Sequence, residues 1–324
     1  MPVSLPAFFH ASDATACLKA CHDLVASTEP VVDASQLVFV DPFGICLLGA
    51  TFCRLRALGR TVRVINLSPS LAAYLTRMDL FEDVALDGCA PAVMARHDQR
   101  YALVELTRLT EHGDVDRAAN RLSKALVGQL PNIDMTAAPD EMTGMTPAET
   151  YQEPLQYALS ELLENALTHA RRAGRRDASV WVASQYYPKK DLIRCAVVDD
   201  GCGFLETLRT HRELSSPTHL AAILAAMRPR VSCNREVGLS SDSINQGVGL
   251  TTTCRIAEAA GGGLTIVSGD AVHSTYALSR DHSCAYWQGV AISLTCQRQR
   301  LPDVRFRDLL PPRDGRPLPP LRFE

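Results

Sequence analysis

The segment around which the rest of the chain is organised reads Leu159-Ser160-Glu161-Leu162-Leu163-Glu164-Asn165-Ala166-Leu167-Thr168-His169-Ala170. Its spacing predicts an amphipathic helix, because leucine and alanine recur every three or four residues along one face. A second series on another face is spaced by four residues: Glu161, Asn165 and His169. A carboxylate, an amide and an imidazole would thus project in one direction. A solvent-exposed helix has a similar pattern, so the role of this series has to be judged from the rest of the chain.

The composition is that of a globular protein with room for two domains. The chain has 324 residues, of which 46% are hydrophobic and 21% charged. Its formal net charge of -3 argues against binding to nucleic acid or to an anionic membrane, since both partners favour basic surfaces.

The cysteines and the hydropathy pattern indicate a cytoplasmic protein. The 11 cysteines are odd in number and contain no Cys-x-x-Cys pair, so neither a disulfide framework nor a zinc site is indicated. No apolar run reaches the roughly 20 residues that cross a bilayer, and no signal-peptide pattern opens the chain. We therefore expect a protein that is not exported and stays in the cytoplasm.

Residues 1–95 alternate strand and helix patterns and are expected to form a first domain. This alternation predicts a small sheet covered by helices. The predicted strands are 3–9, 36–40 and 61–67, and the predicted helices are 13–26, 44–58 and 68–78. Residues 88–97 contain Ala90-Pro91 and are expected to connect this domain to the next.

The first domain resembles the STAS domains of anti-sigma-factor antagonists over about residues 1–86. The resemblance rests on Phe39-Val40-Asp41-Pro42-Phe43-Gly44-Ile45-Cys46-Leu47-Leu48, Gly59-Arg60-Thr61-Val62-Arg63-Val64 and Ser68-Pro69-Ser70. Phosphorylated members of that family carry Ser or Thr directly after the strand-ending Asp, but here Pro42 follows Asp41. Because proline has no hydroxyl, this phosphorylation switch is absent. The resemblance implies a binding role, toward the second domain, a second copy of the chain or another partner.

Residues 96–298 are expected to form a second domain with a mostly antiparallel sheet. Two of its predicted strands, the second and third in chain order, are expected to form a β-hairpin. The predicted strands are 101–109, 178–185, 192–198, 264–267, 274–278 and 290–296, and helices are predicted at 114–130, from 147 onward and at 251–260.

A second motif, Asp199-Asp200-Gly201-Cys202-Gly203, follows the predicted strand 192–198. An Asp at a strand end places a carboxylate at the edge of the sheet, where it can accept a hydrogen bond from an exocyclic amine. The glycines allow the close backbone approach that a flat ligand needs. A polar turn would explain the same residues.

A third motif, Asn245-Gln246-Gly247-Val248-Gly249-Leu250, leads into the predicted helix 251–260. Glycines at a helix N-terminus expose backbone N–H groups and the positive end of the helix dipole. Both favour the binding of phosphate.

Together the three motifs resemble the GHKL superfamily of ATP-binding domains, which includes gyrase, the heat-shock chaperone, histidine kinases and anti-sigma-factor serine kinases. The resemblance covers about residues 100–298 and implies a two-layer α/β sandwich, an α+β arrangement, that binds ATP with Mg²⁺. It implies Asn165 as the Mg²⁺ ligand, Glu161 as the catalytic base and Asp199 as the acceptor for the adenine amine. It further implies Gly201 and Gly203 as the floor of the adenine pocket, Gly247, Val248, Gly249 and Leu250 as phosphate-binding residues, and His169 as a neighbour of the phosphates.

The resemblance also implies a lid over the nucleotide at residues 204–246. This segment contains a predicted helix at 217–227 and then Arg228, Arg230 and Arg235. One of these arginines could stabilise the γ-phosphate, or all three could be solvated surface residues. Residues 299–324 are rich in proline and arginine, which predicts a flexible tail.

Within the superfamily, the anti-sigma kinase type matches best. The segment Asn165-Ala166-Leu167-Thr168-His169 lacks a lysine that many sensor kinases carry there, and no phosphoacceptor helix is visible. Three functions remain open: an ATPase or protein serine/threonine kinase, a module that sequesters a partner in an ATP-dependent way, and a stress-response ATPase. The partner would be a protein such as a sigma factor or an anti-sigma antagonist, and a homodimer is also possible.

Overall fold

The computed structural model describes residues 1–81, 84–87, 98–131, 133–228, 231, 249–276 and 279–305. Residues 1–87, which we call the N-terminal half, alternate short strands with helices. The elements are β1 Val3–Ser4, β2 Phe8–Phe9, α1 Ala14–Ala26, β3 Val31–Asp33, β4 Phe39–Val40, α2 Pro42–Ala57, β5 Arg63–Ile65, α3 Pro69–Arg77 and β6 Ala85–Leu86. A parallel sheet has the order β1-β3-β5-β6, and β2 pairs with β4 in a separate parallel pair.

Local signals explain where the N-terminal helices begin. The Asp41 side chain accepts a hydrogen bond from the Gly44 amide at 3.0 Å, and proline occupies the first turn of α2. Ser68 caps α3 in the same way through the Leu71 amide. The sequence did not predict β3, because three residues are too few to show a period. The predicted strand 3–9 is in fact two strands, β1 and β2.

The C-terminal half, which we define as the described residues from 98 to 305, contains longer elements. They are β7 Leu103–Leu109, α4 Gly113–Val127, α5 Pro147–Ala170, β8 Val180–Tyr187, β9 Leu192–Asp199, α6 Gly203–Leu208, α7 His219–Ala226, α8 Gly249–Ala259, β10 Gly263–Ser274 and β11 His282–Gln297. A capping box starts α5, in which the Thr146 hydroxyl accepts from the Glu149 amide and the Glu149 carboxylate accepts from the Thr146 amide.

The strands of this half form one antiparallel sheet in the order β10-β11-β9-β8-β7. The mixed α/β fold class with an antiparallel C-terminal sheet is thus confirmed. One predicted strand is wrong: within the described residues 274–276, Ser274 alone belongs to a strand, as the end of β10. Two long strands, β10 and β11, take the place of three shorter ones, and their pairing shifts register on both sides of Gly269.

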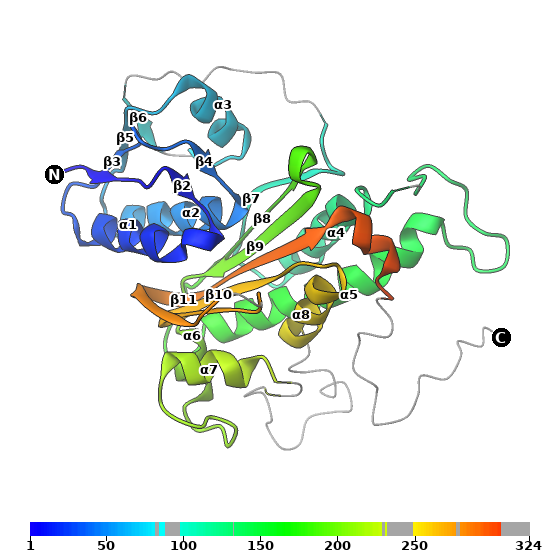
Figure 1. Ribbon diagram of the computed structural model, residues 1–324. Helices are drawn as coiled ribbons and strands as arrows, with labels where there is room; N and C mark the ends of the chain where they lie inside the picture. Colours follow the sequence, from blue (N-terminus) through cyan, green and yellow to red (C-terminus); the bar gives the residue numbers. More distant parts are fainter. Residues whose placement is uncertain are drawn as a thin grey trace.

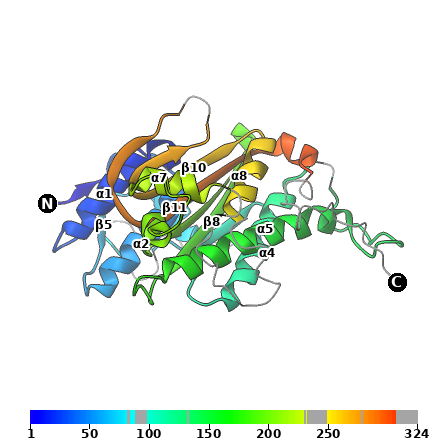
Figure 2. The ribbon, with the colours of Figure 1, turned by 90° about the horizontal axis from the view of Figure 1, so that it is seen from below.

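Helices cover both faces of the antiparallel sheet (Figure 1). On one face, alternate residues such as Val180 and Val182 pack in a core with α4, α5 and α8. On the other face, Trp181 and Ala183 pack in a second core with α1 and α2. Figure 2 shows α5 running along the sheet with α4 beside it. The C-terminal sandwich therefore has a third layer, which is supplied by the N-terminal half.

Polar contacts also join the two halves. Arg194 of β9 donates from Nη1 to Asp41 Oδ2 at 3.0 Å, and its guanidinium lies over the ring of Tyr187. The Tyr74 hydroxyl donates to Gln185 Oε1 at 2.5 Å. The N-terminal half is consequently bound to the second half of the same chain, with Pro42 buried beside Asp41.

The packed structure continues past the last strand. Residues 298–303 form a 3₁₀ helix, and Leu301 and Val304 are 2% and 3% exposed. The first residues of the segment predicted as a tail therefore pack on the core, and residues 306–324 lie outside the described part of the chain. No helix among the described residues is long and apolar enough to span a bilayer.

Candidate functional site

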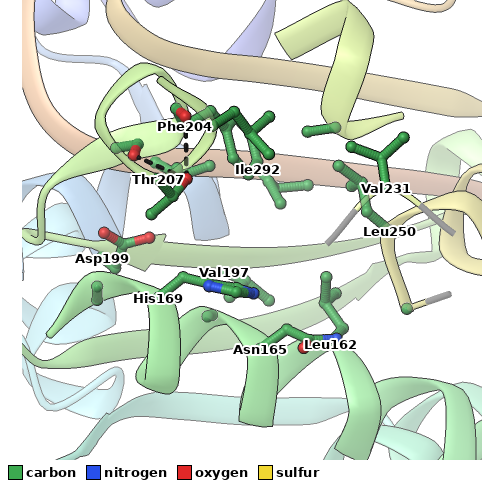
Figure 3. A pocket seen from close by; sticks show the side chains of 17 residues that line it. Leu162, Asn165, His169, Val197, Asp199, Phe204, Thr207, Val231, Leu250 and Ile292 are labelled. Atoms are coloured by element: carbon green, nitrogen blue, oxygen red, sulfur yellow. Dashed lines mark hydrogen bonds between the residues drawn. The ribbon is translucent and has the colours of Figure 1, made fainter. Parts of the chain in front are cut away.

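A cavity brings the three sequence motifs together. It lies between α5, the end of β9, the middle of β11, α6 and the start of α8 (Figure 3). The residues predicted from the sequence that line it are Asn165, His169, Asp199, Gly203, Gly249 and Leu250. Asp199 lies at one end of the cavity in Figure 3, while Asn165 and Leu250 lie toward the other end. The two ends have different chemistry, because one carries a carboxylate and the other a helix N-terminus.

Asp199 is the last residue of β9 and is 4% exposed. Its Oδ1 accepts a hydrogen bond of 2.9 Å from the Gly201 amide. Burial raises the pKa of Asp199 to about 7, although hydrogen bonds from the Gly201 and Val290 amides oppose this rise. Val197, two residues earlier on the strand, lines the same cavity. A single buried carboxyl group therefore stands among apolar side chains.

The glycines after Asp199 bring β9 close to its neighbours. A Cβ atom on Gly201 would lie 2.2 Å from the Ala170 Cα at the end of α5. Gly203 has a φ of +77°, and its Cβ would lie 3.0 Å from the Ser268 hydroxyl. Gly203 lines the cavity, whereas Gly201 packs behind Asp199 and supplies an amide to it.

Helix α5 contributes Asn165 and His169 to the cavity wall. Figure 3 shows His169 beside Val197, between Asn165 and Asp199. Burial, together with the nearby Arg172 charge, lowers the pKa of His169 to about 4, so the imidazole is neutral at physiological pH. His169 can therefore act toward a ligand as a neutral hydrogen-bonding group.

Glu161 precedes Asn165 by about one helical turn and is half-buried. It is absent from the cavity lining formed by the described residues. Partial burial and the neighbouring Glu164 raise the pKa of its carboxyl group. A carboxylate in such a setting is a better proton acceptor than an exposed one.

The start of α8 closes the cavity opposite Asp199. A Cβ on Gly249 would lie 2.8 Å from the Leu162 amide nitrogen, so α8 begins directly against α5. The first amides of an α-helix have no partner within the helix and attract anions. Gly247 and Val248, also predicted to bind phosphate, lie outside the described residues.

The predicted lid is described in part. Its helix is α7, and Arg228 just after it pairs with Glu213 at 3.0 Å. Arg230 and Arg235 lie outside the described residues. The apolar lining residues that were not predicted as part of the site include Phe204, Val231, Val290 and Ile292. The first follows Gly203 directly, so the glycine motif pointed to its position, but its role depends on tertiary packing.

Comparison with known families identifies the class of this domain. Residues 150–282 match the family model described as histidine kinase-, DNA gyrase B-, and HSP90-like ATPase. This range contains most of α5, the Asp199 motif and the start of α8, so residues 150–282 form a GHKL-type ATP-binding domain; Val290 and Ile292 of the cavity lie beyond the matched range. The match begins at residue 150 and so includes none of the N-terminal half. Searches of the curated proteins and of the solved structures found no match.

The cavity fits the nucleotide that this class of domain binds. The apolar walls suit a flat purine ring, and the Asp199 carboxylate can accept a hydrogen bond from its exocyclic amine. The Gly249 amide end of α8 suits phosphate oxygens. Domains of this class usually bind ATP with Mg²⁺, and the Asn165 side chain offers an amide oxygen of the type Mg²⁺ accepts.

Proposed function

We propose that this chain is a cytoplasmic Mg-ATP-binding regulatory protein of the anti-sigma kinase type. It hydrolyses ATP or phosphorylates a Ser or Thr of a protein, and it thereby controls a protein partner. The observation that carries this proposal is the single cavity into which Asn165, Asp199 and the N-terminus of α8 converge.

Each residue has a role that follows from its position. Asp199 accepts a hydrogen bond from the adenine amine at the buried end of the cavity. Asn165 holds Mg²⁺ beside the phosphates, and the Gly249 and Leu250 amides receive the phosphate oxygens. ATP supplies the phosphoryl group. Glu161, one turn from Asn165 and with a raised pKa, accepts the proton of the attacking water or hydroxyl.

The N-terminal half supports a phosphoacceptor on another chain. Under the STAS-like reading of this half, the acceptor hydroxyl would follow Asp41, where Pro42 stands instead. Pro42 is also buried, and the Asp41 carboxylate is engaged by Arg194. A sigma factor or an anti-sigma antagonist is the proposed kind of partner, and a second copy of the chain is the other.

A second candidate function is an ATP-dependent binding module without significant turnover. The observation that favours it is the position of Glu161 outside the described cavity lining. In this case, ATP would set the conformation that holds the partner, and Glu161 would contribute to packing or solubility.

Labelled ATP separates the two functions. The purified protein is incubated with Mg²⁺ and γ-labelled ATP, with and without candidate partners, alongside Glu161→Gln and Asn165→Ala. Glu153→Gln provides a matched control, because Glu153 is exposed on the same helix. We expect Glu161→Gln to bind ATP and to lose turnover, while Asn165→Ala loses Mg²⁺-dependent binding.

Two outcomes contradict the proposal. Absence of turnover by the unmodified protein under every condition would favour the binding module. If Asn165→Ala binds Mg-ATP as tightly as the unmodified protein does, the assignment of the site itself is wrong.

A further inference from the structure

A second cavity of about 230 Å³ lies between the two halves of the chain. It is lined by α1, α2, the residue after β9 and the middle of β11, among them His22, Arg54, Asp200, Tyr286 and Trp287. One water molecule occupies about 30 Å³ in the liquid, and pockets for drug-sized ligands have roughly 300–1,000 Å³. The cavity therefore has room for a ligand of several non-hydrogen atoms.

Opposite charges face this cavity from its two sides. Arg54 belongs to α2 of the N-terminal half, and Asp200 follows β9 of the C-terminal half. Burial raises the pKa of Asp200, and hydrogen bonds from the Ser179 amide, at 2.9 Å, and from its own backbone amide oppose this rise. The charges of Arg108 and then Arg54 favour the ionised form of Asp200, but Arg54 and Asp200, both described, form no ion pair within 4.0 Å. Each charge is thus available to a ligand that lies between them.

Aromatic and basic side chains complete the cavity. Trp287 is 8% exposed and Tyr286 is 52% exposed, so the cavity has an apolar inner wall and an accessible side. His22 of α1 adds a hydrogen-bonding group on the same side as Arg54, because both belong to the N-terminal half. An anionic group suits Arg54 and His22, and a cationic donor suits Asp200.

The second cavity lies next to the nucleotide cavity, across the end of β9. Asp199 faces the nucleotide cavity and Asp200 faces the second one. The Trp287 indole, which lines the second cavity, donates from Nε1 to the Asp199 carbonyl at 3.0 Å. A Cβ on Gly289 would lie 2.2 Å from the same carbonyl oxygen, so the end of β9 and the middle of β11 have little room to move independently.

We infer that the second cavity binds a small zwitterion of amino-acid size, whose occupancy changes the affinity of the nucleotide site. The ligand's carboxylate pairs with Arg54 and its ammonium group with Asp200. The binding step depends on these side chains and not on the nucleotide site. The coupling step rests on the proposed nucleotide site, because it acts through Trp287 and Asp199.

Free amino acids test the binding step. Each proteinogenic L-amino acid is titrated at millimolar concentration against the full chain, and calorimetry and the shift in melting temperature are recorded. The N-acetyl and amide derivatives of each hit are the matched ligands, since each lacks one of the two charges. We expect the free form to bind and both derivatives to bind at least about tenfold more weakly.

Two variants locate the bound ligand. Arg54→Gln should weaken binding at least about tenfold, and Ala26→Trp should block the cavity from the exposed end of α1. Arg56→Gln is the matched control, because Arg56 lies on the same helix and lines a different cavity. If no free amino acid binds, or if Arg54→Gln and Ala26→Trp bind as tightly as the unmodified protein, the inference is wrong.

The coupling step is measured with both ligands. We expect a saturating amino acid to change the Kd of Mg-ATP by at least about fivefold, and Mg-ATP to change the Kd of the amino acid by the same factor. In Trp287→Phe, which keeps an aromatic ring in the wall but lacks the indole N–H, the coupling factor should fall toward one. An unchanged Kd for Mg-ATP in the unmodified protein would overturn the coupling. Failure of Mg-ATP to bind at all would instead contradict the proposed function, while the amino-acid titration would still test the cavity.

Discussion

Arg194 Nη1 lies 3.0 Å from Asp41 Oδ2, and this ion pair joins a strand of the ATP-binding domain to the cap of an N-terminal helix. The Asp41 side chain is 1% exposed and that of Arg194 is 17% exposed. Burial raises the pKa of Asp41, while the Gly44 amide and Arg194 oppose the rise. Asp41, which directly precedes Pro42, therefore serves as a contact between the two halves.

Removing one partner of this pair should destabilise the fold. We expect Arg194→Leu to lower the free energy of unfolding by about 3 kcal/mol, because Asp41 would remain buried without its counter-ion. The loss should grow with pH. The variant raises the pKa of folded Asp41 further, so at pH values between the unfolded-state and folded-state pKa values the folded state binds more protons than the unfolded state. The variant therefore loses stability as pH rises through this range. Urea unfolding at acidic and mildly alkaline pH measures both effects.

The matched control for this variant is Arg63→Leu. Arg63 pairs with Asp87 at an exposed site, with side chains 56% and 45% exposed. Exposed pairs contribute about 0–1 kcal/mol, so this change should have little effect. Equal losses in the two variants would show that the Asp41–Arg194 pair has no special role.

Asp199→Asn should separate stability from binding. Because the folded-state pKa of Asp199 is raised to about 7, its stabilising contribution is present below the unfolded-state pKa and is lost as pH rises through about 7. At pH 8 we therefore expect the ligand-free variant to be more stable than the unmodified protein by on the order of 2 kcal/mol. ATP binding should be lost, because the single amide oxygen would accept the hydrogen bond from the Gly201 amide and leave the N–H₂ donor facing the adenine amine. Thermal unfolding and calorimetry measure the two quantities.

The affinity for adenosine should depend on pH in the unmodified protein. Adenosine has no phosphate groups that titrate near neutrality, and its amine pairs with the ionised form of Asp199. We expect affinity to fall about tenfold per pH unit below pH 7 and to level off above it, following the pKa of about 7. Ligand-observed NMR can follow this weak binding. A flat profile would contradict the role given to Asp199.

Gly201→Ala should disturb the site through packing alone. The added Cβ would lie 2.2 Å from the Ala170 Cα, a backbone atom that cannot move away without shifting α5. We expect a loss of about 3 kcal/mol or more together with weaker ATP binding. Gly113→Ala is the control, since a Cβ there meets nothing within 4 Å, and it should change stability by less than about 1 kcal/mol. Similar melting curves for the two variants would refute this account of Gly201.

The C-terminal half should fail to fold without the N-terminal half. A fragment starting at residue 98 would expose the sheet face that α1 and α2 cover, including Trp181, Val198 and Trp287. Exposed apolar faces of this kind cause aggregation. We expect an insoluble or ANS-binding fragment, and recovery of a cooperative transition when residues 1–87 are supplied as a second chain. A monomeric, cooperatively folding fragment would show that the third layer is dispensable.

Much of the site could be predicted from the sequence, because its signals are local. The start of α5 at Pro147 and its four-residue series Glu161, Asn165 and His169 follow from helical periodicity. The cavity brings Asn165 and His169 together with Asp199, and the family match covers the same range. The separate positions of Glu161 and Gly201, outside the cavity lining, depend on how α5 and β9 pack and have no sequence signal.

The sequence by itself determined the helix faces, the strand-ending Asp199 and the absence of a hydroxyl at position 42, because periodicity and residue chemistry are properties of short segments. Only the tertiary structure decided what covers the second face of the sheet. Alternating apolar residues such as Trp181 and Ala183 show that a face is buried, but the burial of apolar surface is non-directional and does not specify the covering element. The contact between Asp41 and Arg194, 153 residues apart, arises from that packing.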